Sequence, residues 1–362
     1  MLKRFLCMVL TVGFLFGFMP GNAEAVSTSA TAAILVDVDS GRVLYEQNAD
    51  RKMLIASTTK ILTALVAIRE GNLSDRVIVS RKAAYTEGSS MYLKEGEALT
   101  LETLLYGLLL CSGNDAAVAI AEHVGGSEKR FVQMMNALAK ELGMVNSSFA
   151  NPNGLDDEAH FSTARDMSKL ACAAVNDPTL VRIASTRSVS IGGRTMTNHN
   201  KLLNYMSNCI GLKTGFTKAA GRTLVSCAER NGQRLVAVTL QDGNDWADHE
   251  ALFTYGFETF PAQRFANLGS VVEEAAIQGG IYANVPLVAS NRFSWPIKAG
   301  EVVKTKIDLQ EPLRAPLLAG TQVGTAIYEL NGSEIGRVEL LCGKTVLPKI
   351  SSALTTLKTG LT

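Results

Sequence analysis

The sequence predicts an α+β protein in which an antiparallel sheet packs against a separate cluster of helices, followed by a smaller all-β domain. Strand-like apolar runs begin near residue 32, helical periodicity dominates from about residue 57 to residue 140, and strand-like runs return after residue 182. The repeated strand–helix–strand alternation that builds a parallel sheet is missing, so the strands are expected to pair antiparallel. The length of 362 residues exceeds one comfortable core and favours two domains.

Residues 1–25 have the pattern of a secretory signal peptide. Two basic residues precede an apolar run over residues 5–19, and Ala23-Glu24-Ala25 is a small–x–small cleavage site. The apolar run is shorter than the roughly 20 residues that span a bilayer, which favours cleavage over an uncleaved anchor. We therefore expect an exported protein whose mature chain begins at Val26 and works in a periplasm or in the wall space outside the membrane.

The first domain is expected over residues 26–260 and opens with a β-hairpin. Apolar residues at 32–38 and 42–47 flank Asp39-Ser40-Gly41, a turn-forming sequence. The later pattern predicts, in chain order, a helix over residues 163–175 capped by Ser162 or Thr163, a strand over 182–191, a hairpin of 223–228 and 235–240 turning at Asn231-Gly232, and a helix near 249–257.

A second, β-rich domain is expected over residues 261–345. Val303, Thr305, Ile307 and Leu309 alternate with polar residues at period two, and Asn331-Gly332 is a hairpin turn sequence. This part carries no catalytic constellation. It fits either a stalk that positions the first domain or an interaction module, and the sequence does not choose between them.

Residues 346–362 end the chain as a possible amphipathic, membrane-associating tail. Its apolar side chains fall on one helical face, at Ile350, Ala353, Leu354, Leu357 and Leu361. The stripe is short, has no aromatic residue and carries only two lysines, so contact with the cytoplasmic membrane would be weak. A frayed tail and a helix packed on the β domain are the alternatives.

Ser57-Thr58-Thr59-Lys60 stands at the head of an apolar helical run over residues 61–68. A helix brings positions i and i+3 onto one face, so the Ser57 hydroxyl and the Lys60 amine are expected within hydrogen-bond distance. A serine hydroxyl is a poor nucleophile until a base takes its proton, and lysine takes it only when burial or a neighbouring cation lowers its pKa. Taken alone, the tetrapeptide is more typical of an ordinary helix start with Ser57 as N-cap.

Two later motifs change that interpretation. Ser112-Gly113-Asn114 falls between two apolar helical stretches, so its side chains should project from a tight loop toward a neighbouring site. Lys213-Thr214-Gly215 precedes the predicted hairpin, on a strand that would border the nucleophile. Lys213 and Thr214 suit a carboxylate, and Gly215 lets an extended substrate lie close to the strand. Together and in this order, the three motifs indicate an acyl-transfer site.

These motifs are the signature of penicillin-binding proteins and serine β-lactamases, and further segments narrow the resemblance. They are NPNGL at 151–155, HFSTARDM at 160–167, NHNKLL at 198–203 and GLKTGFT at 211–217. Over about residues 29–342 the chain resembles the D-alanyl-D-alanine carboxypeptidases, the low-molecular-mass penicillin-binding proteins of peptidase family S11. The resemblance implies a β-lactamase/transpeptidase-like catalytic domain with its active site at the seam between sheet and helices.

The resemblance also implies a reaction and its partners. A Ser57 acyl-enzyme would release the terminal D-alanine of peptidoglycan stem peptides, and β-lactam antibiotics would be covalent inhibitors. Lys60 would take the serine proton, Ser112 would help pass it to the departing D-alanine, and Asn114 would hold the substrate backbone. The implied oxyanion donors are the backbone N–H groups of Ser57 and Phe216.

Three other functions share part of this pattern. A β-lactamase would need fast deacylation, but the Glu-x-x-Leu-Asn segment of class A enzymes is missing, and the extra β domain also argues against it. A DD-endopeptidase that cuts cross-links would use the same chemistry, and the residues do not exclude it as a second activity. A catalytically silent wall-binding protein is disfavoured because all three motifs are intact.

Composition implies no cofactor, no metal and no nucleic-acid partner. The 35 basic and 34 acidic residues nearly balance, and the five cysteines after residue 25 show no zinc or redox spacing. Cys111 adjoins Ser112, but a free cysteine more often acts as a small apolar residue. His160 and His199 lie in the family-like segments, where packing is favoured over substrate contact.

Overall fold

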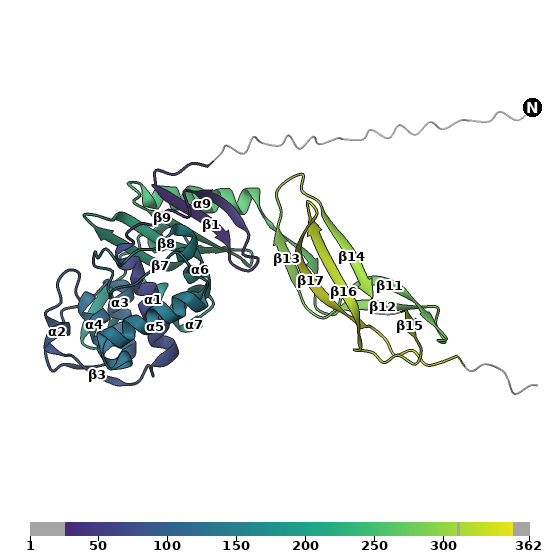
Figure 1. The fold of residues 1–362 in the computed structure, drawn as a ribbon, viewed down its shortest axis with the longest axis horizontal. Coiled ribbons are helices and arrows are strands. Elements are labelled where there is room, and N and C mark those ends of the chain that lie inside the picture. Colours follow the sequence, from purple (N-terminus) through teal and green to yellow (C-terminus); the bar gives the residue numbers. More distant parts are fainter. Residues whose placement is uncertain (1–25, 310–311, 350–362) are drawn as a thin grey trace, which may run out of the picture.

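The computed structural model describes residues 26–309 and 312–349 (Figure 1). The predicted signal peptide, residues 1–25, and most of the predicted amphipathic tail, residues 350–362, therefore lie outside the described residues. No helix among the described residues is long and apolar enough to cross a bilayer.

A five-stranded antiparallel sheet forms the centre of the first part of the chain, and its strand order is β2-β1-β9-β8-β7 (Figure 1). The opening hairpin pairs with a much later strand, because Ala32 lies opposite Leu240. The predicted turn at Asn231-Gly232 is confirmed, with positive φ at both residues, as this hairpin type requires. The strands are β1 (Ala32–Asp37), β2 (Val43–Gln47), β7 (Cys209–Thr217), β8 (Gly221–Arg230) and β9 (Gln233–Leu240).

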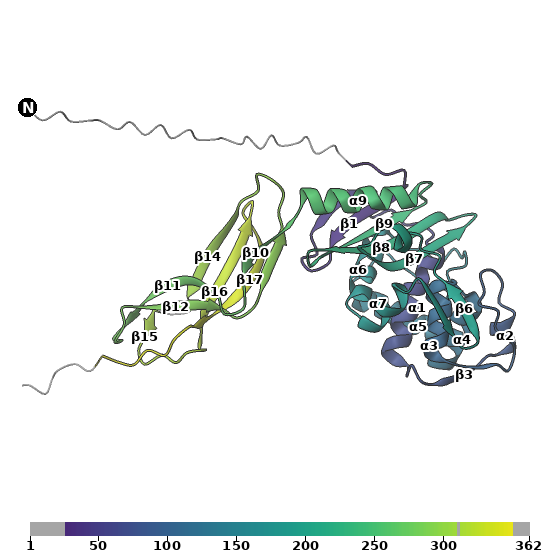
Figure 2. The same cartoon turned by 180° about the vertical axis from the view of Figure 1, so that it is seen from behind.

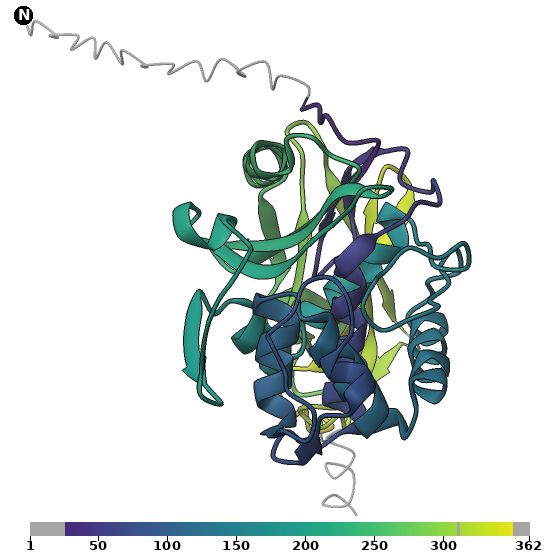
Figure 3. The ribbon, with the colours of Figure 1, turned by 90° about the vertical axis from the view of Figure 1, so that its left-hand side faces the viewer.

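Helices cover both faces of this sheet, as the end-on view in Figure 3 shows. The larger layer shares one apolar core with the sheet and holds the motif residues near Ser57 and Ser112. Its helices are α1 (Lys60–Glu70), α2 (Arg81–Ala84), α3 (Leu101–Leu110), α4 (Asn114–Gly125), α5 (Glu128–Glu141), α6 (Ala164–Val175) and α7 (Pro178–Ala184). On the other face, α8 (Leu202–Tyr205) and α9 (Asp245–Thr259) pack in a second core that includes Leu224 and Phe253. The expected antiparallel sheet and helical cluster are confirmed, with α9 as an additional cover.

Two of the predicted segments are partly wrong. Residues 182–187 are not strand, because α7 continues to Ala184 and only β5 (Ser188–Ile191) pairs, with β6 (Arg194–Thr197). Asp177 starts that helix, since its side chain accepts a hydrogen bond from the backbone N–H of Leu180 at 2.8 Å, and proline follows at the first helical position.

The second error lies inside the stretch predicted as helical from about residue 57 to residue 140. Two short strands, β3 (Arg76–Ile78) and β4 (Ala98–Thr100), pair there. Most of the chain between them, residues 85–97, is irregular and reaches the active-site region. Helix α9 also begins earlier than expected, at Asp245.

The remaining residues form a second, all-β unit with its own apolar core (Figure 2). Phe293 and Tyr328 stack at its centre, with ring centroids 4.5 Å apart. The predicted alternation at 303–309 is a strand, and Asn331-Gly332 joins β16 to β17 as expected. The strands are β10 (Ala262–Ala266), β11 (Val271–Gln278), β12 (Asn284–Ala289), β13 (Phe293–Pro296), β14 (Val303–Leu309), β15 (Leu313–Arg314), β16 (Gln322–Leu330) and β17 (Ser333–Cys342).

Replacing Asp177 with alanine should lower the free energy of unfolding by about 1 kcal/mol, because the first turn of α7 loses its side-chain acceptor. Urea unfolding at pH 7 measures this change. Asn176→Ala, at an exposed neighbouring position, is the control and should change stability little. Equal destabilisation by both variants would mean that Asp177 does not act as the cap.

Candidate active site

Ser57 lies in a short 3-10 turn, η1 (Ala56–Thr59), directly before α1. The expected proximity is present, because the Lys60 Nζ and the Ser57 Oγ are 2.8 Å apart. Ser57 is not the N-cap of α1, since that position is Thr59 and no side-chain capping bond forms there. The serine hydroxyl is therefore left for contact with Lys60 rather than used to start the helix.

The Lys60 amine is fully buried and has three hydrogen-bond partners. Besides Ser57, Nζ lies 2.7 Å from Asn114 Oδ1 and 2.6 Å from the carbonyl oxygen of Asn153. A neutral amine has two N–H donors and one lone pair, so it can donate to both carbonyl oxygens and accept from the Ser57 hydroxyl. Burial, followed by the charge of Lys213, holds the pKa of Lys60 well below its usual value. The arrangement suits a base.

The Ser112-Gly113-Asn114 turn connects α3 to α4 as predicted. Ser112 has a positive φ of 59° and lines the same cavity as Ser57. Asn114 is the first residue of α4, and its amide group is already bonded on both sides: Oδ1 accepts from Lys60, and Nδ2 donates to the Glu87 carbonyl at 2.7 Å. In this structure Asn114 therefore ties the lysine to the irregular segment 85–97.

Asp115 is a buried residue that the sequence analysis did not single out. Its carboxylate accepts hydrogen bonds from the Ser90 hydroxyl at 2.6 Å and from the backbone N–H groups of Met91 and Leu93 at 3.1 and 3.0 Å. These bonds fix segment 85–97 against the start of α4, so that Ser89 lines the cavity. The sequence signal that could have identified Asp115 is its position directly after the Ser112-Gly113-Asn114 motif.

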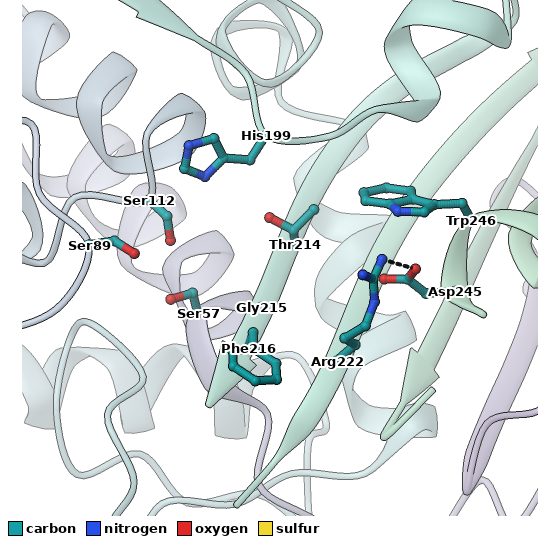
Figure 4. A pocket seen from close by; sticks show the side chains of 10 residues that line it. All are labelled: Ser57, Ser89, Ser112, His199, Thr214, Gly215, Phe216, Arg222, Asp245 and Trp246. Carbon is teal, nitrogen blue, oxygen red and sulfur yellow. Dashed lines mark hydrogen bonds and ion pairs between the residues drawn. The ribbon is translucent and has the colours of Figure 1, made fainter. Parts of the chain in front are cut away.

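Lys213, Thr214 and Gly215 lie on β7, the sheet edge that borders the nucleophile (Figure 4). Thr214 and Gly215 line the cavity, as does the exposed Phe216. The Lys213 side chain is buried and turned back, and its Nζ donates to the Thr214 carbonyl at 2.9 Å. Burial lowers the pKa of Lys213 to about 7.

Packing requires a glycine at position 215, for a reason that the sequence alone did not indicate. A Cβ at this position would lie 2.4 Å from Thr223 Oγ1 and 3.0 Å from the backbone nitrogen of Ser57. Only glycine lets β7 approach the nucleophile turn this closely. The approach brings strand backbone beside the Ser57 N–H, where two backbone donors can face one oxygen.

The 151–155 segment packs against the nucleophile turn. The carbonyl of Asn153 accepts from Lys60, and Gly154 has φ +86° with its Cα against the Ala56 carbonyl. His160 lies behind the same turn, with Nε2 2.8 Å from Thr59 Oγ1. Burial lowers the pKa of His160 to about 4, so it packs as a neutral ring. The segment was noted for its resemblance but was given no role.

His199 and Cys111 are the two other residues considered from the sequence, and only His199 is among the residues that line the cavity. His199 lines the cavity, and partial burial together with the charge of Lys213 lowers its pKa. Cys111 is half-buried with a raised pKa, caused first by burial, which keeps it a thiol. Among the described residues, no group of three His, Cys, Asp or Glu side chains could hold a metal ion.

This fold and site define a serine acyl-transfer enzyme of the penicillin-binding class, and comparisons with known proteins agree. The family model described as D-alanyl-D-alanine carboxypeptidase matches residues 20–244, and that of the C-terminal domain of penicillin-binding protein 5 matches residues 260–347. The chain belongs to the D-alanyl-D-alanine carboxypeptidase family, and its enzyme class is that of the serine-type D-Ala-D-Ala carboxypeptidases. The family is extracytoplasmic.

Relatives match over nearly the whole chain. D-alanyl-D-alanine carboxypeptidase DacC of Escherichia coli is 36% identical, over 91% of this chain and 88% of its own. DacF of Bacillus subtilis is 31% identical over 91% of both chains. Among solved structures, penicillin-binding protein 5 of Haemophilus influenzae has a TM-score of 0.74 at 29% identity, covering 89% of this chain and 99% of that one. The predicted family, fold class and enzyme class are confirmed.

Replacing Gly154 with alanine should destabilise the protein by roughly 2–5 kcal/mol and reduce acylation, because a Cβ there would lie 2.0 Å from the Ala56 carbonyl oxygen, beside Ser57. Thermal unfolding and the rate of benzylpenicillin acylation measure the two effects. Gly143→Ala is the matched control: its φ is +71° but its surroundings are open, so it should cost about 1 kcal/mol and leave acylation intact. Equal effects of the two variants would contradict the packing argument.

Replacing Lys213 with methionine should move the acid limb of the acylation profile to higher pH. Lys60 acts as a base only when neutral, and the positive charge of Lys213 lowers its pKa; removing that charge raises the pKa of Lys60. The rate of benzylpenicillin acylation between pH 4 and pH 10 measures the shift. Lys218→Met, at an exposed lysine in the turn after β7, should leave the limb in place. An unmoved limb in Lys213→Met would show that the two amines do not interact.

Proposed function

We propose that the enzyme removes the terminal D-alanine of peptidoglycan stem pentapeptides through an acyl-enzyme on Ser57, with Lys60 as the base, Ser112 as the proton relay and the residues of β7 as the substrate-binding strand. The observation that carries this proposal is the Lys60 environment. Its Nζ is fully buried 2.8 Å from the serine hydroxyl, and burial followed by the charge of Lys213 lowers the pKa of Lys60, which favours the neutral amine that can act as a base.

Acylation begins when the Ser57 hydroxyl gives its proton to Lys60 while Oγ attacks the carbonyl carbon of the penultimate D-alanine. The backbone N–H groups of Ser57 and Phe216 hold the developing negative charge on the carbonyl oxygen. The close approach of β7 to the nucleophile turn, which Gly215 permits, supports this pairing of donors. Lys60 and Asn114 keep their mutual hydrogen bond, so the amine stays oriented as it gains charge.

The second half of acylation breaks the bond between the penultimate and terminal D-alanine. The leaving nitrogen takes a proton that comes from Lys60 by way of the Ser112 hydroxyl, which lines the cavity beside Ser57. Free D-alanine departs, and water then attacks the acyl-enzyme ester to regenerate Ser57. The same serine reacts with β-lactams, because the lactam carbonyl enters the position of the scissile carbonyl.

Substrate lies along the edge strand β7. Thr214 contacts the terminal carboxylate directly, and Lys213 contributes its charge from behind, through Thr214. Gly215 leaves room for an extended peptide beside the strand. Asn114 contacts the peptide backbone on the opposite side of Ser57 through the second N–H of its Nδ2, since the first donates to the Glu87 carbonyl.

The enzyme is exported and works at the outer face of the cytoplasmic membrane in this proposal. Residues 1–25 form the removed signal peptide, residues 26–260 the catalytic domain and residues 261–345 a stalk, with residues 346–362 in peripheral contact with the membrane. The described chain ends at one end of the β-rich unit, and this end lies away from the helical layer (Figure 1). This position supports a role for the β-rich unit as a spacer between the catalytic domain and the tail.

Replacing Ser57 with alanine should abolish both D-alanine release and covalent labelling by benzylpenicillin, since no other group replaces the nucleophile. Intact-mass spectrometry over time, with D-alanine assayed from a peptide ending in D-Ala-D-Ala, measures both. Ser112→Ala should still form the adduct, but more slowly. An adduct of undiminished yield on the Ser57→Ala protein would place the nucleophile elsewhere.

A further inference from the structure

Three segments meet at the end of the β-rich unit where the described chain stops (Figure 2). They span residues 279–284, 314–321 and 343–349, and together we call them the tip. The backbone N–H of Lys349, the last described residue, donates to the Gly279 carbonyl at 2.7 Å. The chain therefore leaves the described structure directly from this surface.

Backbone pairing determines which side chains of the tip share a face. Ile281 lies opposite Leu347 in an antiparallel pair, and its N–H donates to the Leu347 carbonyl at 3.0 Å. Leu317 and Val346 also pair, and both pack on the core of the β-rich unit. Side chains alternate along extended chain, so Leu318 and Leu347, each one residue further on, point away from that core. Residues opposite each other share a face, so Ile281 points the same way.

This outward face of the tip is apolar, and the described chain leaves it uncovered. Ile281 is 52% exposed, Leu318 66% and Leu347 57%, and the neighbouring Tyr282 is 47% exposed. Single exposed apolar side chains are common on any protein surface, but a group of them on one face indicates a contact site.

The tip is also basic. Its three segments contain Arg314, Lys344 and Lys349 but no aspartate or glutamate. The Lys344 Nζ lies 4.1 Å from the centre of the Tyr282 ring, which places this cation beside the apolar face. Apolar side chains bordered by an aromatic ring and long basic side chains suit the interface of an anionic bilayer, where the former enter the acyl region and the latter meet phosphates.

We propose that the tip enters the surface of an anionic lipid bilayer, with its three exposed aliphatic side chains among the acyl chains and its three basic side chains at the lipid phosphates. This inference rests on the proposed position at the outer face of the membrane. It goes further because it assigns the contact to folded loops of the β-rich unit and not to the tail alone. A contact made by three segments also fixes the direction in which the β-rich unit stands on the membrane.

Charge favours a bilayer over the two other candidates for this face. A symmetric contact with a second copy would set the three cations of one tip against the three of the other. Residues 350–362 contain one lysine and no acidic residue, so they bring no opposite charge to the tip either. An anionic bilayer supplies both an apolar layer and negative charge.

The test measures how the purified protein, with residues 350–362 intact, partitions onto vesicles of phosphatidylglycerol and phosphatidylethanolamine in a co-sedimentation assay. Leu318→Asp should lower the partition coefficient about 10-fold, and Ile281→Asp should do the same. Each change removes an inserted aliphatic side chain and adds a charge that anionic lipid repels. Vesicles of phosphatidylcholine alone should bind the unchanged protein more weakly.

The matched control is Val302→Asp, which makes the same kind of change at the other end of the β-rich unit. Val302 is 70% exposed, and its neighbour Glu301 pairs with Arg42, at the turn between β1 and β2. This end faces the catalytic half of the protein, so the substitution should leave the partition coefficient unchanged.

Fluorescence separates the tip from the tail. Tyr282→Trp places an indole at the tip, and lipids brominated on their acyl chains should quench its emission when vesicles bind. The wild-type protein, whose Trp246 and Trp295 lie outside the tip, gives the background.

Unchanged partition of both aspartate variants would overturn the proposal, because the tail alone would then hold the protein on the membrane. Absence of extra quenching in the Tyr282→Trp protein would also overturn it. So would a lipid-free dimer that Leu318→Asp dissociates, since the face would then belong to a second copy. Failure of the proposed function is seen separately, because D-alanine release and the Ser57 adduct are measured without lipid, where the tip variants should behave as the wild type.

Discussion

The burial of the Lys60 amine among three hydrogen-bond partners constrains the rest of the catalytic half of the protein. Each partner comes from a different segment: the nucleophile turn, the start of α4 and the 151–155 loop. A buried ammonium is costly, and the neutral amine is stable there only if its donors and its lone pair are satisfied. The helices, the sheet edge and the loop must therefore be placed together for the base to exist.

Glycines and backbone carbonyls largely determine how closely these segments approach one another. Gly215 lets the edge strand touch the nucleophile turn, and Gly154 lets the 151–155 loop pass under it. The side chains around them then need little freedom: His160 is a buried neutral ring and Asp115 is saturated by backbone donors. The cavity beside these supports is lined by Ser57, Ser112 and Thr214.

Much of this was predictable from sequence, for identifiable reasons. Local spacing predicted the Ser57–Lys60 contact, and turn chemistry predicted the hairpins at Asn231-Gly232 and Asn331-Gly332. The strand expected at 182–191 was mostly wrong. The β-branched residues of α7 suggested a strand, but the capping sequence Asp177-Pro178 starts a helix there. Contacts made across the fold gave no local sign. The Asn153 carbonyl, which contacts Lys60, is a backbone group, and Arg222 on β8 lines the cavity from the strand next to β7. These depend on how distant segments meet.

The pairing of β1 with β9 has a consequence for how the molecule forms. Ala32 and Leu240 are neighbours in the finished sheet, yet almost the whole catalytic unit lies between them in the chain. The sheet cannot close until β9 is present, so one edge of β1 stays unpaired until nearly the whole catalytic unit has been made. Until then the free edge of β1 is open to pairing with other chains. A long separation in sequence between paired strands slows folding, so the pairing of β1 with β9 makes the catalytic unit slower to form than its local helices are.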